Sequence, residues 1–200
     1  MRKVFLATAV VFLFIIISPV QGVGEKTPGN TLMPQINKLV DRLQKLKPDE
    51  KGGLKYTEIY GIIESAFDFR TLSMLSLGVN WKRFSEKQKT EFTDLFSRLI
   101  TQLYLDKIKG QDIQDVRVEY GKTAQIESAS ERADVHTVVH HNGTQTPVVY
   151  RMILTEDGWK VYDVVIEGVS MVGNYREQYR KKMFDSPESM INEIREKLDQ

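Results

Sequence analysis

Residues 158–176 read GWKVYDVVIEGVSMVGNYR, and this stretch says more about the fold than any other part of the chain. An Asp-Gly pair at 157–158 is a typical tight turn, and the β-branched and aromatic residues at 159–167 favour a strand. Gly168 breaks the strand pattern, and we expect a helix to follow over about 169–183. The stretch contains no obvious catalytic group.

The second half of the chain predicts a sheet. Strands are expected over residues 113–120, 124–128, 133–141, 146–155 and 159–167. Asn142-Gly143 separates two of these runs and is a strong hairpin signal. Five strands joined by tight turns predict an antiparallel sheet.

The first half and the end of the chain predict helices. Residues 23–32 are rich in Gly, Pro, Thr and Asn and predict a disordered lead-in. Helical spacing of apolar residues predicts helices over about 34–46, 56–67, 68–78, 85–110 and from 187 onward. The fourth helix begins at a capping box, Ser85 to Gln88, and carries an apolar stripe of Phe92, Leu95, Phe96, Leu99 and Leu103. Helices around a sheet give an α+β domain.

The N-terminus has the three parts of a secretory signal peptide. Arg2 and Lys3 precede an apolar run over residues 4–17, and small residues lie before a cleavage point after Gly22. The alternative is an uncleaved anchor, but the run is shorter than the ~20 residues that a membrane span needs. We therefore expect a signal peptide over residues 1–22 and a single domain over residues 23–200.

Composition narrows the possible partners. Removing Arg2 and Lys3 from the 28 basic residues leaves 26, against 27 acidic residues. This overall balance gives no electrostatic basis for binding nucleic acid or an acidic membrane surface. The chain has no cysteine, which excludes disulfides, thiol chemistry and a lipoprotein anchor.

The three histidines, His136, His140 and His141, invite a metal hypothesis because they cluster. On a strand, His136 and His140 face the same side but lie roughly 13 Å apart. That distance is too long for one zinc ion, and no cysteine completes a ligand set. We expect exposed histidines beside a hairpin turn, and no metal. The turn also explains the Asn142-Gly143-Thr144 sequon.

Three carboxylates in apolar surroundings, Asp68, Asp163 and Glu167, leave an enzyme as an alternative. Burial raises the pKa of a carboxyl group toward the range of a general base. However, the sequence shows no partner acid, no nearby histidine and no serine nucleophile pattern. Asp68 can equally cap the helix that follows it, and Asp163 can face solvent or a neighbouring strand.

The apolar residues can be read in two ways. They are ordinary core in the simplest interpretation. An exported domain with a helix layer and a curved sheet can instead leave an apolar cavity between the two, and Met74, Met152 and Met171 suit an adaptable cavity lining. The sequence alone leaves both interpretations open.

Two blocks of residues resemble one family in type and spacing. The first block is Phe67, Asp68, Phe69, Leu77, Gly78, Trp81, Ser85, Gln88, Phe92, Phe96, Leu99 and Tyr104. The second block is Pro147–Arg151, Gly158–Val164, Glu167–Ser170 and Asn174–Arg176. With these blocks the chain resembles the MlaC-like, or toluene-tolerance, family of periplasmic phospholipid-binding proteins. Val79 and Asn80 depart from the family pattern, which we interpret as local variation in a loop.

The resemblance implies an NTF2-like cone, in which helices and a twisted antiparallel sheet surround an apolar lipid cavity. It implies a monomeric periplasmic carrier of phospholipid that is not an enzyme and needs no cofactor. Its implied partners are an inner-membrane ABC transporter with an MCE-domain ring and an outer-membrane lipoprotein–porin complex. The implied role of such a carrier is to help maintain the lipid asymmetry of the outer membrane.

Acyl chains are then expected between the apolar stripe of the 85–110 helix and the sheet, with the polar head at the cavity mouth. The expected cavity lining is Phe67, Met74, Trp81, Phe92, Phe96, Leu99, Leu103, Tyr150, Met152, Trp159, Val161, Tyr162, Ile166, Val169 and Val172. The alternatives are an exported NTF2-like enzyme with a buried carboxylate as base, and an interaction subunit whose apolar residues are only core. A basic run from Arg176 to Lys182 fits either partner docking or a solvated helix face.

Overall fold

The computed structural model describes residues 27–45, 53–108, 114–127 and 131–199. Its helices are α2 (Pro28–Gln44), α3 (Gly53–Ala66), α4 (Phe69–Leu77), the 3-10 helix η1 (Gly78–Arg83), α5 (Glu86–Ile108), α6 (Met171–Arg180) and α7 (Pro187–Leu198). Its strands are β1 (Arg117–Glu127), β2 (Arg132–His141), β3 (Thr144–Thr155), β4 (Gly158–Ile166) and β5 (Val169–Ser170). The expected signal peptide and the Gly110 end of the long helix lie outside the described residues.

Helix α2 begins earlier than the sequence predicts. The lead-in expected over residues 23–32 is helical from Pro28, and Pro34 lies inside the helix. The Thr27 side chain accepts a hydrogen bond from the Asn30 N–H at 3.2 Å, and Pro28 occupies a first-turn position that tolerates proline. Leu32 is fully buried, so packing also holds this first turn in place.

The sheet is an antiparallel meander with the strand order β1-β2-β3-β4-β5. This confirms the predicted α+β class and the antiparallel sheet. The two strands expected over 113–120 and 124–128 are one strand, β1, with register shifts after Tyr120 and after Gln125. Such bulges leave residues unpaired without ending a strand, which explains why the sequence pattern breaks there.

The quoted stretch forms β4, a turn, β5 and α6. Glu167 and Gly168 both have positive φ, 49° and 82°, which is typical of a two-residue hairpin turn. The hairpin makes β5 the edge of the sheet, with Val165 opposite Ser170. Ser170 then caps α6, because its side chain accepts a hydrogen bond from the Gly173 N–H at 2.9 Å.

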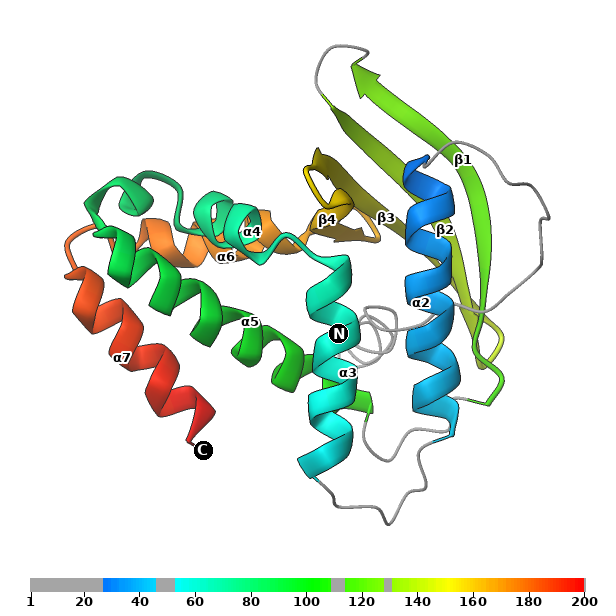
Figure 1. The fold of residues 1–200 in the computed structure, drawn as a ribbon, viewed down its shortest axis with the longest axis horizontal. Helices are drawn as coiled ribbons and strands as arrows, with labels where there is room; N and C mark the ends of the chain where they lie inside the picture. The colour runs from blue at the N-terminus through cyan, green and yellow to red at the C-terminus, as the bar shows by residue number, and fades with distance from the viewer. Residues whose placement is uncertain (1–26, 46–52, 109–113, 128–130, 200) are drawn as a thin grey trace.

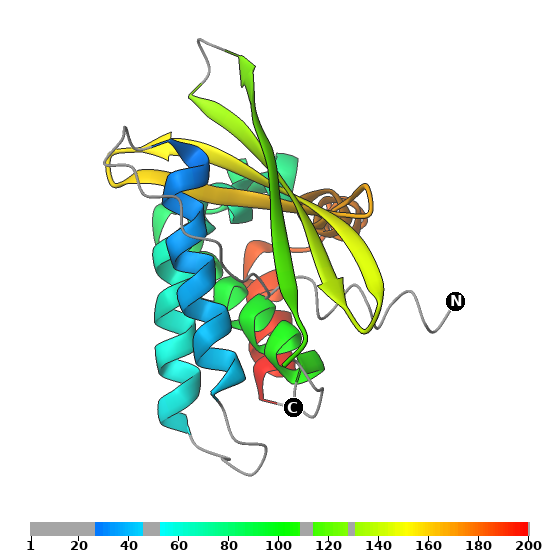
Figure 2. The same ribbon diagram turned by 90° about the vertical axis from the view of Figure 1, so that its right-hand side faces the viewer.

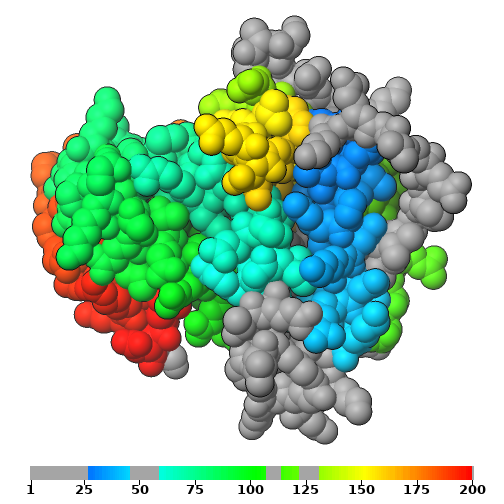
Figure 3. Space-filling model, viewed as in Figure 1, coloured from blue at the N-terminus to red at the C-terminus, as the bar shows by residue number. Residues whose placement is uncertain are grey.

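Helices α2 and α3 lie side by side across one face of the sheet (Figures 1 and 2). Buried residues alternate along β2 and β3, and the buried set faces this helix pair: Ala133, Val135, Thr137, Val139, Thr146, Val148, Tyr150 and Met152. The space-filling view shows α2 and α3 as one continuous surface in front of the sheet (Figure 3).

The remaining helices, α4 to α7, gather at the β4–β5 end of the sheet (Figure 1). Strand β4 contacts α2 and α3 as well as α4 and α6. Its residues are therefore buried on both faces, from Val161 to Ile166 without interruption. The buried apolar residues of the helix pair, the sheet and the helical cluster form one continuous core.

Candidate functional site

A closed apolar slot lies between α2, α3 and the inner face of the sheet. It has a volume of about 20 Å³ and is lined by Gln35, Ile36, Leu39, Ile62, Ile63, Ala66, Phe67 and Tyr150. None of these side chains carries a charge, and burial raises the pKa of the Tyr150 hydroxyl well above its usual value. The slot is therefore neutral and too small for anything larger than a water molecule. A larger ligand can enter only if the walls of the slot move apart.

Gln35 is the polar exception in this slot. Its Oε1 atom is buried and accepts no hydrogen bond from any other residue that the structure describes. A buried acceptor without a donor costs free energy, commonly about 1–3 kcal/mol. The unpaired Gln35 acceptor therefore makes the closed slot less stable at the wall that α2 forms.

Phe67 joins the slot to a larger pocket on the surface. It lies at the junction between α3 and α4 and forms a parallel bridge to Val161 of β4. The Asp68 N–H donates to the Val161 carbonyl at 2.8 Å, which attaches the junction to the sheet. The Phe67 ring stacks on Phe69, with 5.4 Å between centroids. Phe67 thus forms part of the wall of both spaces.

Two open pockets follow α5 on the side that faces α3. The first, of about 580 Å³, is lined by Tyr60, Glu64, Phe67, Asp68, Phe69, Arg70, Thr90, Thr93, Asp94, Ser97, Thr155, Asp157 and Lys160. The second, of about 570 Å³, is lined by Tyr60, Arg98, Thr101, Gln102, Leu105, Asp106 and Leu198. Tyr60 stands between them, with its hydroxyl 2.7 Å from the Ser97 hydroxyl. Both pockets include charged side chains in their lining, in contrast to the slot.

The sheet residues expected to line a cavity come together on the inner face. Tyr150 forms one wall of the slot. Its neighbours are paired across the strands, with Met152 opposite Val161 and Val148 opposite Ile166. Trp159, Val161 and Ile166 are all buried. Tyr162 of β4 differs from these residues because it has no partner in the pairing with β3, at a register shift between Val161 and Asp163. Its ring lies 5.5 Å from the Arg132 guanidinium.

The apolar stripe of α5 has a different neighbour from the one we expected. Phe96 packs edge-on against Tyr175 and Tyr179 of α6, with centroid distances of 4.9 and 6.0 Å. Phe92 packs against Tyr179 in the same way at 5.5 Å. Phe92, Phe96 and Leu99 are buried in the helical cluster, so these rings form a helix–helix core. An apolar stripe indicates a buried face and does not indicate which element covers it.

The other expected lining residues are spread over the helical cluster. Met74, Leu103 and Val169 are exposed, with 38%, 42% and 64% of their surface accessible. The Trp81 ring is in contact with the charged groups of Arg70 and Lys89, each 5.5 Å from the ring centroid. Val172 is buried in the first turn of α6.

The three candidate catalytic carboxylates have structural positions. Asp68 caps α4, accepting a hydrogen bond from the Thr71 N–H at 2.9 Å. Asp163 is buried and accepts hydrogen bonds from the side chains of Arg151 and Ser170 and from the Val172 N–H, at 3.1, 2.6 and 3.0 Å. Glu167 is exposed in the β4–β5 turn.

The histidines lie along β2 and at its end. His140 faces Glu119 at 3.4 Å, and His141 faces Asp115 at 3.5 Å. Across the described residues, no three His, Asp or Glu side chains are grouped in a way that could hold a metal ion.

The residues of α2 and α3 that line the slot were not identified as site residues from the sequence. Ile36, Leu39 and Ile63 are recognisable as apolar positions at helical spacing. Nothing in their spacing separates a slot wall from a solid core. Gln35, one position away from the apolar stripe of α2, is the only polar signal, and it is a weak one.

Comparisons with known proteins place the chain in a family. Residues 35–196 match the sequence profile described as MlaC protein. The chain belongs to the MlaC family. The match covers both blocks of residues that carried the resemblance, and it includes α3 to α6, most of α7 and all five strands.

A solved structure shares the MlaC-family fold described here. It is the phospholipid-binding protein from Ralstonia solanacearum, determined in complex with a phospholipid. The two chains superpose with a TM-score of 0.69 and 21% identity, over 83% of this chain and 96% of that chain. A comparison with curated proteins found no match. In the described part of the chain, no helix is long and apolar enough to cross a membrane.

Proposed function

We propose that this chain binds phospholipid and carries it across the periplasm. Family membership supports this function, and so does the shared fold with a protein that was solved with a phospholipid. The observation in this chain that supports it best is the slot: an uncharged space under a helix pair, closed in this state and able to enlarge only if its walls move apart.

The physical need for a carrier is large. Two acyl chains of about 15 CH₂ groups each would cost about 24 kcal/mol to expose to water, at about 0.8 kcal/mol per group. Unassisted transfer across an aqueous space would therefore be very slow. An apolar interior removes most of this cost, while the charged head group can stay in contact with water at the mouth.

We place the acyl chains between α2, α3 and the sheet, and the head group in the first pocket. Phe67, which borders both spaces, would mark the passage between them. Tyr150, Met152, Val161 and Ile166 of the sheet would then contact the chains. The other expected lining residues would support this cavity from the helical cluster.

The test of this site adds the same side chain at two positions of α3. Ala66 lines the slot and is 4% exposed, so Ala66→Phe fills the space that the chains would use. Gly61→Phe is the matched control, because a Cβ at Gly61 meets no atom within 4 Å. The exported protein and both variants are extracted, and their lipids are measured by mass spectrometry.

Parent protein and Gly61→Phe should carry phospholipid, and folded Ala66→Phe should carry much less. Overpacking a core commonly costs about 1–3 kcal/mol, so circular dichroism must show that Ala66→Phe is folded. A parent that contains no phospholipid and takes up none from donor vesicles would refute the function. Equal lipid content in both variants would refute the placement.

The wider system is also a proposal. We infer from the family that the carrier exchanges lipid with an inner-membrane ABC transporter bearing an MCE-domain ring and with an outer-membrane lipoprotein–porin complex. This exchange would maintain outer-membrane lipid asymmetry. Site-specific crosslinking in cells, followed by mass spectrometry of the captured proteins, tests both partners. Capture of neither partner from either membrane would contradict this role.

Export is proposed from the N-terminal sequence. A signal peptide over residues 1–22 would leave a chain that begins at Val23 and consists of one lipid-binding domain. The intact mass of the exported protein tests the cleavage point. A mass that includes the first 22 residues would show that the segment is retained.

A further inference from the structure

The connection between α6 and α7 exposes two adjacent apolar side chains. Met183 is 50% exposed and Phe184 is 90% exposed. The connection lies at the end of the helical cluster that is far from α2 and α3 (Figure 1). Single exposed apolar residues are common on protein surfaces, but an aromatic ring with almost all of its surface in water on a fixed loop is a different case.

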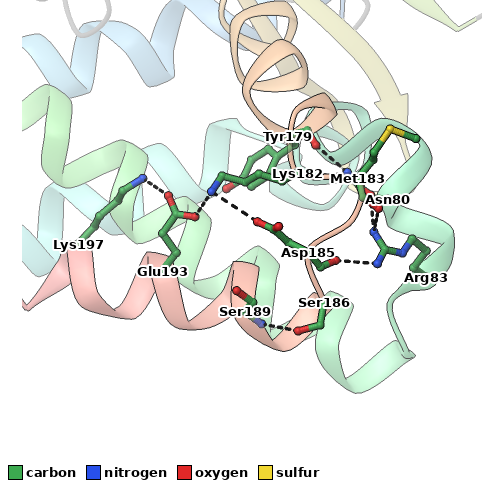
Figure 4. Close-up of polar contacts among 10 residues, drawn as sticks. All are labelled: Asn80, Arg83, Tyr179, Lys182, Met183, Asp185, Ser186, Ser189, Glu193 and Lys197. Atoms are coloured by element: carbon green, nitrogen blue, oxygen red, sulfur yellow. Dashed lines mark hydrogen bonds and ion pairs between the residues drawn. The ribbon is translucent and has the colours of Figure 1, made fainter.

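The connection between α6 and α7 is held by hydrogen bonds from the side chains of η1 (Figure 4). The Arg83 guanidinium donates to the carbonyls of Met183 and Asp185, at 2.7 and 2.6 Å. It also donates to the Asn80 side-chain oxygen at 2.9 Å, and the Asn80 amide donates to the Tyr179 carbonyl at 2.9 Å.

These bonds anchor the backbone on each side of Phe184. Asn80 is 1% exposed, so this support belongs to the core of the helical cluster. A loop whose backbone is already fixed loses little backbone freedom when its side chain binds. The fold therefore keeps Phe184 in water and ready for contact.

The surroundings of the exposed pair are basic. Lys82 and Arg83 end η1, Arg180 ends α6, and Lys181 and Lys182 follow it; the acidic residues that come next are Asp185 in the loop and Glu188 in the first turn of α7. Arg180 is paired with Glu177, and Lys182 with Glu193. Lys82 and Lys181 are exposed, and neither takes part in an ion pair with another described residue. We call Lys82, Lys181, Met183 and Phe184 the basic-apolar tip.

We propose that the basic-apolar tip docks on the surface of a phospholipid bilayer that contains anionic lipids. Lysines attract anionic head groups, while an aromatic and a thioether side chain reach the acyl boundary below them. A protruding tip suits a fluid surface, which needs no preformed pocket to receive it. This contact is separate from the slot and would hold even if the slot carried no lipid.

Sedimentation with vesicles tests the proposal on the full exported chain. The vesicles contain phosphatidylethanolamine with phosphatidylglycerol, or phosphatidylcholine alone. Parent protein should bind the anionic vesicles at low salt, bind the neutral ones less, and dissociate as salt rises. Phe184→Ser should weaken binding about tenfold, from the lost burial of one aromatic ring. Lys181→Glu should weaken it at least fivefold, at about 1 kcal/mol per basic residue.

Leu154→Ser is the control, because Leu154 is also partly exposed, at 37%, and lies at the end of β3. It should bind vesicles as the parent does, and the lipid content of Phe184→Ser by mass spectrometry should match that of the parent. Failure of the parent to bind anionic vesicles overturns the proposal and makes a protein the candidate occupant of the tip. Equal binding by Phe184→Ser and parent also overturns it.

Discussion

The carboxylate of Asp163 accepts hydrogen bonds from three groups of the fold. Its Oδ1 accepts from the Val172 N–H, and its Oδ2 accepts from Arg151 and Ser170. Asp163 is 2% exposed, so water could not take over as the acceptor for these three donors if the carboxylate were removed. A general base must reach its substrate, and Asp163 lines neither the slot nor either of the two surface pockets. We interpret Asp163 as a structural residue whose hydrogen bonds join β4 to the start of α6.

Asp163→Ala should therefore destabilise the protein strongly. It leaves a buried N–H and a hydroxyl without an acceptor, for an expected loss of about 3 kcal/mol. Urea unfolding followed by circular dichroism measures this loss. Glu156→Ala, in the exposed β3–β4 turn, is the control and should stay within about 0.5 kcal/mol of the parent. Equal stability of both variants would contradict the structural role.

Gln35→Leu should have the opposite effect on stability. It removes a buried acceptor that has no donor and leaves an apolar side chain of similar length in an apolar slot. We expect a gain of about 1 kcal/mol in the free energy of unfolding. A closed state that is more stable by this amount lowers lipid occupancy about fivefold. Thermal unfolding and lipid mass spectrometry measure the two effects.

The control is Gln178→Leu, which makes the same change on the exposed face of α6. It should change neither quantity. A Gln35→Leu variant that is less stable than the parent would show that the amide has a partner in solution.

At the scale of elements, we expect the contact between α6 and α7 to depend on pH. Glu193 of α7 accepts hydrogen bonds from Lys182, which follows α6, and from Lys197. These bonds lower the pKa of Glu193 below 4.5, and the bond from Lys182 has the larger effect. An acid with a lowered pKa in the folded state stabilises the protein above its unfolded pKa. That contribution disappears as the pH falls through the folded value.

Glu193→Gln should consequently melt at a lower temperature than the parent at pH 7 and at the same temperature well below pH 4.5. The difference should stay below about 1 kcal/mol, because the Glu193 side chain is 33% exposed and screened by water. Glu196→Gln, on the exposed face of the same helix, should match the parent throughout. A difference that persists in acid would assign the effect to packing.

Short-range signals in the sequence predicted the elements well. The Ser85 capping box is present, with the Gln88 side chain accepting from the Ser85 N–H at 3.0 Å. Ser186 caps α7 through the Ser189 N–H at 3.1 Å. Each of these patterns depends on residues within one helical turn, so a single sequence contains all the information needed.

Contacts between distant elements were harder to predict. The continuity of β1 depends on β2, which pairs on both sides of the bulge after Tyr120. The stripe with Phe92 and Phe96 gave no indication of whether α6 or the sheet covers it. The slot was missed for the same reason, since its walls come from α2, α3 and β3. Spacing along one segment does not record which other segment will pack on it.

At the scale of the whole molecule, strand β4 connects every layer. It pairs with β3 and β5 and contacts α2, α3, α4 and α6. Helix α2, in contrast, packs on α3 and the inner face of the sheet. We therefore expect opening of the slot to move the helix pair while β4 stays in its place.

This difference sets the order in which backbone amides exchange with deuterium. The amides of β4 should be the slowest in the chain, because only global unfolding exposes them. The amides of α2 should exchange through a separate, smaller opening, and bound phospholipid should change their rates without changing those of β4. Mass spectrometry of pulse-labelled protein measures both rates. If α2 and β4 exchange together with and without lipid, the molecule opens as one unit and the helix pair is not a separate lid.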